Sequence, residues 1–147
     1  MQILVDADAC PVKSIIKQTA MRYRLPVILF FDTAHRYEDG YSQIVMVETA
    51  ADSVDFALLQ RIKKGDIVVT QDYGLAAMAL GRRAKVLHHD GMQYSEFNID
   101  GLLMKRYLNQ KHRRSGERNK GPAARTEESN RKFTEALDSL ILSIKEL

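Results

Sequence analysis

Short apolar runs alternate with segments of helical periodicity along most of this 147-residue chain. The runs that suit strands are residues 3–5, 27–31, 44–47, 67–69 and 86–87. Several of them are apolar at nearly every position, as expected where both faces of a sheet are covered. Because such alternation is typical of β/α units, it predicts an α/β fold with a mainly parallel central sheet flanked by helices.

The segments between these runs predict the helices. A first helix begins near Pro11, because proline is tolerated in the first turn of a helix. A second follows Asp52, a suitable N-cap residue, and carries Asp55 in its first turn. A third spans about residues 73–80 and ends at a glycine, and the apolar pattern of residues 102–108 indicates a fourth.

Composition divides the chain into three parts. We expect residues 1–110 to form the α/β domain, residues 111–125 a basic linker, and residues 126–147 a helix that packs on the domain. The linker is rich in Arg, Ser, Gly, Asn, Lys and Pro, which is typical of loops. The terminal helix needs a covering surface because it has one apolar face. That face consists of Phe133, Leu137, Leu140, Ile141 and Ile144.

The sequence shows no sign of export or membrane insertion. Met1 leads directly into the first strand, without a basic and apolar leader. The longest apolar run, residues 75–80, is far shorter than the roughly 20 residues that span a bilayer. Cys10 is the only cysteine, which excludes an internal disulfide and a cysteine-rich zinc site. We therefore expect a cytoplasmic protein without membrane or disulfide partners.

Two aspartates, Asp6 and Asp8, follow the first strand in the stretch VDADACP. In open α/β sheets, ligands bind outside the carboxyl ends of the strands, so both carboxylates stand where a site is expected. The structural alternative is that one of them caps the helix beginning near Pro11. One cap needs only one aspartate, so the pair favours a binding site.

Asp72 should reach the same sheet edge, because it follows the strand at residues 67–69. Asp55 lies in or before the second helix. Each of the two can instead serve its own helix as a cap or first-turn acid, and Asp66, at the opposite end of its strand, suits a turn. Carboxylates brought together raise each other's pKa unless a cation neutralises them. An all-oxygen ligand set suits Mg²⁺ or Mn²⁺.

Positive charge is concentrated between residues 105 and 125, where 8 Lys and Arg residues face 1 acidic residue. Such a segment can contact the phosphates of RNA, or it can be a solvated linker. The interface would include Lys105, Arg113, Arg114, Arg118 and Lys120. Tyr107 is the one aromatic residue interleaved with these charges, so recognition by base stacking is weakly supported.

Two further groups have plain structural readings. His88, His89 and Asp90 suggest a metal site, but neighbouring residues at a strand end point in opposite directions, which favours a strand end and a turn. Cys10 stands beside carboxylates that disfavour a thiolate, so we expect a small buried residue.

With these motifs in view, the chain resembles the YaiI/YqxD family of uncharacterised bacterial proteins. The residues that carry the resemblance are the VDADACP stretch at 5–11, Asp55, Gly65, Asp66, Val69, Thr70, Asp72, Leu75, Ala76, Gly121, Pro122, Arg131, Phe133 and Leu137.

A more distant resemblance concerns the strand ending in Asp, the helix acid and the later Thr-x-Asp, which are similar to metal-dependent PIN-type nucleases. This resemblance implies a PIN-like fold and a nuclease that hydrolyses RNA or another phosphodiester with water. It also implies that Asp6, Asp8, Asp55 and Asp72 hold Mg²⁺ or Mn²⁺, with Asp6, Asp8 and Asp72 as the catalytic residues.

Two other functions stay open. Asp6-x-Asp8 after a strand also looks like the phosphatase motif that uses an aspartyl-phosphate, with Asp6 as nucleophile and Asp8 as acid and base. Cys10 stands near where that motif has Thr, and no lysine element is placed. In the third reading, a non-catalytic protein binds RNA through the basic segment, and the acids are helix caps.

Overall fold

The computed structural model describes residues 1–32, 36–50, 52–114, 116 and 124–146. Six strands and five helices are assigned within them. In chain order they are β1 (Ile3–Asp6), α1 (Lys13–Tyr23), β2 (Val27–Phe31), β3 (Gln43–Met46), α2 (Ser53–Arg61), β4 (Ile67–Val69), α3 (Tyr73–Gly81), β5 (Lys85–Leu87), β6 (Gln93–Tyr94), α4 (Ile99–Arg114) and α5 (Glu127–Lys145).

One sheet of six strands runs through the molecule in the order β3-β2-β1-β4-β5-β6. The pairs from β3 to β5 are all parallel, and only β6 runs antiparallel, beside β5. The predicted α/β fold with a mainly parallel sheet is therefore confirmed. Of the six strands, β6 is the one that the sequence did not predict, because a two-residue strand is too short to show a pattern.

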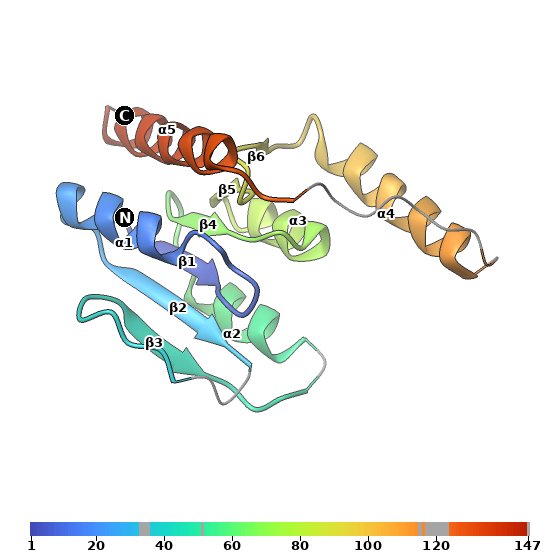
Figure 1. Cartoon of the computed structure of the whole chain (residues 1–147), viewed down its shortest axis with the longest axis horizontal. Coiled ribbons are helices and arrows are strands. Elements are labelled where there is room, and N and C mark those ends of the chain that lie inside the picture. The colour runs from blue at the N-terminus through green and yellow to red at the C-terminus, as the bar shows by residue number, and fades with distance from the viewer. Residues whose placement is uncertain (33–35, 51, 115, 117–123, 147) are drawn as a thin grey trace.

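Helices cover both faces of this sheet (Figure 1). Successive residues of a strand point to opposite faces, and β1 divides accordingly. Ile3 and Val5 pack with α1 and α5, whereas Leu4 packs with α2, α3 and the start of α4. This double coverage explains why the strands are apolar throughout.

The C-terminal helix α5 completes the first of these layers. Phe133, Leu137 and Ile141 are fully buried beside α1 and the sheet. Thr126 caps the helix, since its hydroxyl accepts a hydrogen bond from the Ser129 amide at 3.3 Å. The β5–β6 turn approaches α5 so closely that a Cβ on Gly91 would lie 2.8 Å from the Lys132 carbonyl oxygen.

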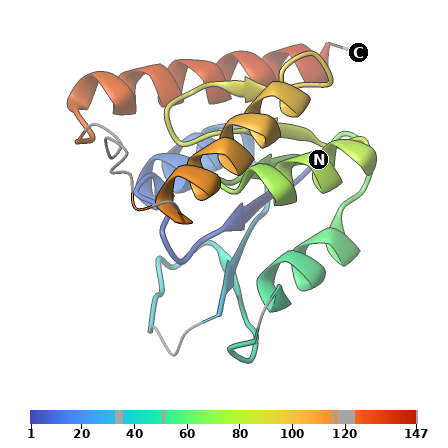
Figure 2. The ribbon, with the colours of Figure 1, turned by 90° about the vertical axis from the view of Figure 1, so that its right-hand side faces the viewer.

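Helix α4 leaves the body of the molecule. It begins against α3, and its far end projects past the edge of the sheet where the parallel strands end (Figures 1 and 2). The helix continues to Arg114, so residues 111–114 of the predicted linker are helical. Lys105 and Arg113 are exposed on it. The side chain of Arg114, and the whole of Arg118 and Lys120, lie outside the described residues.

None of the described helices combines the length and apolarity that a membrane crossing requires. Cys10 is a free, buried thiol, as expected. Burial raises the pKa of this thiol to about 11, which keeps it protonated at neutral pH.

Candidate functional site

The centre of the sheet is a topological switch point. The chain moves outward from β1 through β2 to β3 on one side, and through β4 to β5 on the other. Ligands of open α/β sheets bind at the carboxyl ends of the strands that flank such a point. A cavity of about 320 Å³ opens there, and six aspartates line it. They are Asp6, Asp8, Asp32, Asp52, Asp55 and Asp72.

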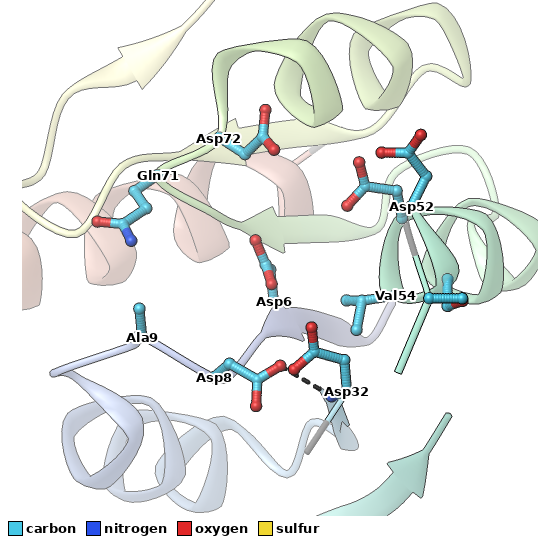
Figure 3. A pocket seen from close by; sticks show the side chains of 11 residues that line it. Asp6, Asp8, Ala9, Asp32, Asp52, Val54, Gln71 and Asp72 are labelled. Atoms are coloured by element: carbon cyan, nitrogen blue, oxygen red, sulfur yellow. Dashed lines mark hydrogen bonds between the residues drawn. The ribbon is translucent and has the colours of Figure 1, made fainter. Parts of the chain in front are cut away.

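The aspartates come from four separate segments of the chain. Asp6 ends β1 and stands near the middle of the group, with Asp72 on one side of it and Asp8 and Asp32 on the other (Figure 3). Asp52 approaches from the start of α2 (Figure 3). The four predicted ligands Asp6, Asp8, Asp55 and Asp72 thus line one cavity.

Thr70 positions Asp6. Its buried hydroxyl donates to Oδ2 of Asp6 at 2.9 Å and accepts the backbone N–H of Asp72 at 3.0 Å. The Thr70 carbonyl in turn accepts from the hydroxyl of Tyr94 at 3.1 Å. Burial raises the pKa of Asp6, the Thr70 hydrogen bond lowers it, and the charges of Asp72 and Asp8 add to the rise.

Asp72 caps helix α3 with one oxygen. Its Oδ1 accepts from the amides of Gly74 and Leu75 at 2.8 and 3.2 Å, and Arg106 of α4 reaches the same atom at 3.3 Å. The capping reading of this residue is therefore correct. It does not exclude a ligand role, because no hydrogen bond to Oδ2 is found within the described part of the chain.

Asp32 belongs to this group although the sequence analysis did not select it. Its backbone N–H donates to Oδ2 of Asp8 at 2.8 Å, which ties the β1–α1 loop to the end of β2. The neighbouring Asp8 carboxyl raises the pKa of Asp32, chiefly through a hydrogen bond between the side chains. The missed signal was its position, since Asp32 directly follows a predicted strand.

Asp52 and Asp55 complete the cavity from α2. Asp52 occupies the N-cap position with a left-handed backbone (φ 62°), but its side chain makes no capping hydrogen bond, contrary to the expectation. The pKa of Asp55 is raised to about 6 by burial first, and then by the charges of Asp72, Asp6 and Asp52. Asp55 stands in the first turn of α2, as expected. Both carboxylates line the cavity and add negative charge to it.

The donor chemistry of this cavity fits Mg²⁺ or Mn²⁺. Both ions prefer oxygen ligands, and Mg²⁺ commonly uses one or two carboxylates together with water. Burial first, and then the charges of neighbouring aspartates, raise the pKa of Asp6 and of Asp55, and a cation would relieve the repulsion. Among the described side chains, no three His, Cys, Asp or Glu residues already converge as a metal would require. A shared cation therefore requires the carboxylates to rotate toward it.

Other residues considered from the sequence lie away from this cavity. Asp66 is buried at the opposite end of β4, where it accepts hydrogen bonds from Gln2 and Lys63. His88 and Asp90 pair at 2.9 Å within the β5–β6 turn. His89 is buried, and its Nε2 atom has no hydrogen-bond partner within the described structure. These residues match the structural readings given to them.

Comparison with known proteins places the chain in a family. A family model described as the uncharacterised YaiI/YqxD family matches residues 4–143. A UPF0178 protein of Ruminiclostridium cellulolyticum is 54% identical over 93% of this chain and 90% of its own length. A UPF0178 protein of Clostridium acetobutylicum is 47% identical over 97% of both chains. No solved structure matches. The chain belongs to the YaiI/YqxD family.

Proposed function

We propose that this protein is a divalent-metal-dependent nuclease that hydrolyses phosphodiester bonds of RNA. The observation that carries the proposal is that six aspartates from four segments line one cavity at the β1/β4 switch point. Helix capping uses one oxygen of one of them, so capping does not account for the group. The distant likeness to PIN-type nucleases supports the same reading.

Five of the six aspartates have a role in this proposal. The ligands of Mg²⁺ or Mn²⁺ would be Asp6, Asp8, Asp55 and Asp72. The bound ion would polarise the substrate phosphate and lower the pKa of a bound water. Thr70 fixes the orientation of Asp6, and the α3 cap leaves Oδ2 of Asp72 for the ion. Asp32 holds the loop that carries Asp8. The exposed basic residues of α4, which include Lys105 and Arg113, supply positive charge for the RNA backbone.

The test replaces Asp6 with Asn, which removes one negative charge and keeps a hydrogen-bonding group. We expect Asp6→Asn to weaken Mn²⁺ binding by more than about tenfold, since changes to the hydrogen-bond partners of metal ligands already cost 10- to 100-fold. Cleavage of a generic single-stranded RNA should fall with it. Stability without metal should be unchanged or slightly raised, because one repelling carboxylate is gone. Glu96→Gln is the matched control, since Glu96 is exposed and lines a different hollow.

Three results would contradict the proposal. Absence of Mn²⁺ binding by calorimetry at millimolar metal would show that the aspartates do not hold a metal ion. Equal RNA cleavage by Asp6→Asn and the wild type would remove Asp6 from the reaction. Labelling of the protein by a phosphomonoester, through a hydroxylamine-sensitive bond that Asp6→Asn abolishes, would establish the aspartyl-phosphate phosphatase instead.

A further inference from the structure

Arg106 connects the projecting helix α4 to the acidic cavity. Its Nη1 atom lies 3.3 Å from Oδ1 of Asp72, and a Cβ added to Gly74 would meet the same nitrogen at 3.2 Å. The guanidinium therefore rests against the first turn of α3. Leu102 and Leu103, one helical turn earlier, pack in the core that contains α3. This packing fixes the direction from which Arg106 reaches the cavity rim.

The contact between Arg106 and Asp72 is loose. The two side chains are 47% and 37% exposed, and a single nitrogen makes the contact. The oxygen it meets already accepts the amides of Gly74 and Leu75. Exposed ion pairs with one contact contribute little to stability. The guanidinium can therefore leave Asp72 without disturbing the α3 cap.

A phosphate anion that approaches this cavity meets strong negative charge. The described lining contains six aspartates and no Lys, Arg or His. Arg106 is the cation that opposes the rise of the Asp55 pKa, which burial and the surrounding aspartates cause. Its positive charge therefore already acts on the cavity. A guanidinium can also form two parallel N–H···O bonds to a phosphate, which an ammonium group cannot do.

We propose that Arg106 binds a phosphate of the substrate, and that it exchanges Asp72 for that phosphate when a divalent cation neutralises the carboxylate. This inference rests on the proposed function, because the exchange needs a cation at Asp72. Arg106 is thus the counter-ion of Asp72 when no metal is bound, and it binds the substrate phosphate when the metal is bound.

The structure also favours a polynucleotide over a small phosphodiester. Positions four and seven residues further along a helix lie on the same face, and in α4 they are Gln110 and Arg113. Both are exposed, on the C-terminal half of α4, and this helix projects past the sheet edge (Figure 1). With a rise of 1.5 Å per residue, Arg113 stands about 10 Å beyond Arg106 along the helix. A chain of phosphates can follow this face away from the cavity.

Three variants test the inference. Arg106→Gln removes the charge, Arg106→Lys keeps the charge but not the planar fork, and Lys105→Gln removes an equal charge one position away on α4. Two quantities are measured for each folded variant, with thermal melting as a check of the fold. One is the Mn²⁺ dissociation constant without nucleic acid. The other is the affinity, with and without Mn²⁺, for a single-stranded phosphorothioate oligoribonucleotide that resists hydrolysis.

We expect Arg106→Gln to tighten Mn²⁺ binding about two- to fivefold, because a competing cation is gone. It should weaken oligonucleotide binding about tenfold in Mn²⁺ and hardly at all without it. Arg106→Lys should bind Mn²⁺ as the wild type does, and its oligonucleotide affinity should lie between those of the wild type and Arg106→Gln. Lys105→Gln should leave Mn²⁺ binding unchanged and weaken oligonucleotide binding equally in both conditions.

Two outcomes overturn the inference alone. The first is identical behaviour of Arg106→Gln and Lys105→Gln in both titrations, which would make Arg106 an ordinary surface charge. The second is tighter Mn²⁺ binding by Arg106→Gln without loss of oligonucleotide affinity, which would leave Arg106 as a counter-ion only. In both cases the proposed function would still stand, because the wild-type protein binds Mn²⁺. A wild-type protein that binds no Mn²⁺ overturns both proposals.

Discussion

Replacement of Thr70 by Val should destabilise the protein although the two side chains have nearly the same shape. The Thr70 hydroxyl is fully buried and makes two hydrogen bonds, to the Asp6 carboxylate at 2.9 Å and from the Asp72 amide at 3.0 Å. Loss of the bond to a charged acceptor costs about 2 kcal/mol, and an unsatisfied amide costs about 2 kcal/mol more. Burial of the extra methyl group returns about 1 kcal/mol. The net loss is about 3 kcal/mol, or a fall in Tm of about 10 °C for a domain of this size.

Urea unfolding, followed by far-UV circular dichroism and tyrosine fluorescence, measures this loss. Thr70→Ser keeps the hydroxyl and should lose only about 1 kcal/mol, the contribution of one buried methyl group. Thr134→Val is a second control, because the Thr134 hydroxyl donates to the Asn130 carbonyl within its own helix and has no other hydrogen bond to the described residues. If Thr70→Val is no less stable than Thr134→Val, the hydroxyl does not hold Asp6 and Asp72 together as described.

Two further predictions concern the region where α5 meets the β5–β6 turn. Gly91→Ala should cost more than about 2 kcal/mol, because φ is +94° and the new Cβ would lie 2.8 Å from the Lys132 carbonyl oxygen. In α4, a Cβ added to Gly101 would meet nothing within 4 Å, so Gly101→Ala should stabilise the protein by about 0.5–1 kcal/mol. Equal effects of the two substitutions on the free energy of unfolding would contradict the close packing of Gly91 against α5. Burial first, and then the charges of His88 and Arg125, lower the pKa of His89 to about 4. In the unfolded chain His89 takes up a proton below its ordinary pKa of about 6.5, whereas in the folded protein it stays neutral down to about pH 4. The contribution of His89 to stability is therefore complete above about pH 6.5 and is lost as the pH falls toward 4. Between pH 7 and pH 5 the loss due to His89 should be about 2 kcal/mol. His89→Leu should remove this part of the pH dependence and His88→Gln should keep it, and parallel curves for wild type and His89→Leu would refute the assignment.

Much of the fold could be predicted from local patterns. A run such as residues 27–31 is apolar at every position, and a run of this short length is typical of a strand covered on both faces. Asp6 and Asp72 could be placed at one sheet edge because each lies at or just beyond the carboxyl end of a strand of the same parallel sheet. These inferences need only the period of the sequence and the direction of the strands.

The rest of the site depends on which strands are neighbours and on where helices leave the sheet. The sheet edge of Asp32 could have been predicted, because it directly follows a strand. Its contact with Asp8 could not, because it depends on β2 lying beside β1, and no local pattern gives the strand order. Asp52 was expected to be a cap because its residue type is favoured at that position, but its backbone is left-handed and its side chain makes no capping hydrogen bond. Arg106 reaches Asp72 only because α4 begins against α3.

The position of α5 has a consequence for the order of folding. The helix supplies Phe133, Leu137, Leu140 and Ile141 to the same buried cluster as Ile3 and Val5, from the other end of the chain. Until these residues have been synthesised, α1 alone covers this face of the sheet, and the growing chain exposes the rest of the face on the ribosome. Contacts of such long sequence separation form slowly, because a large loop must close first. The nascent protein should therefore depend on chaperones until its last helix emerges.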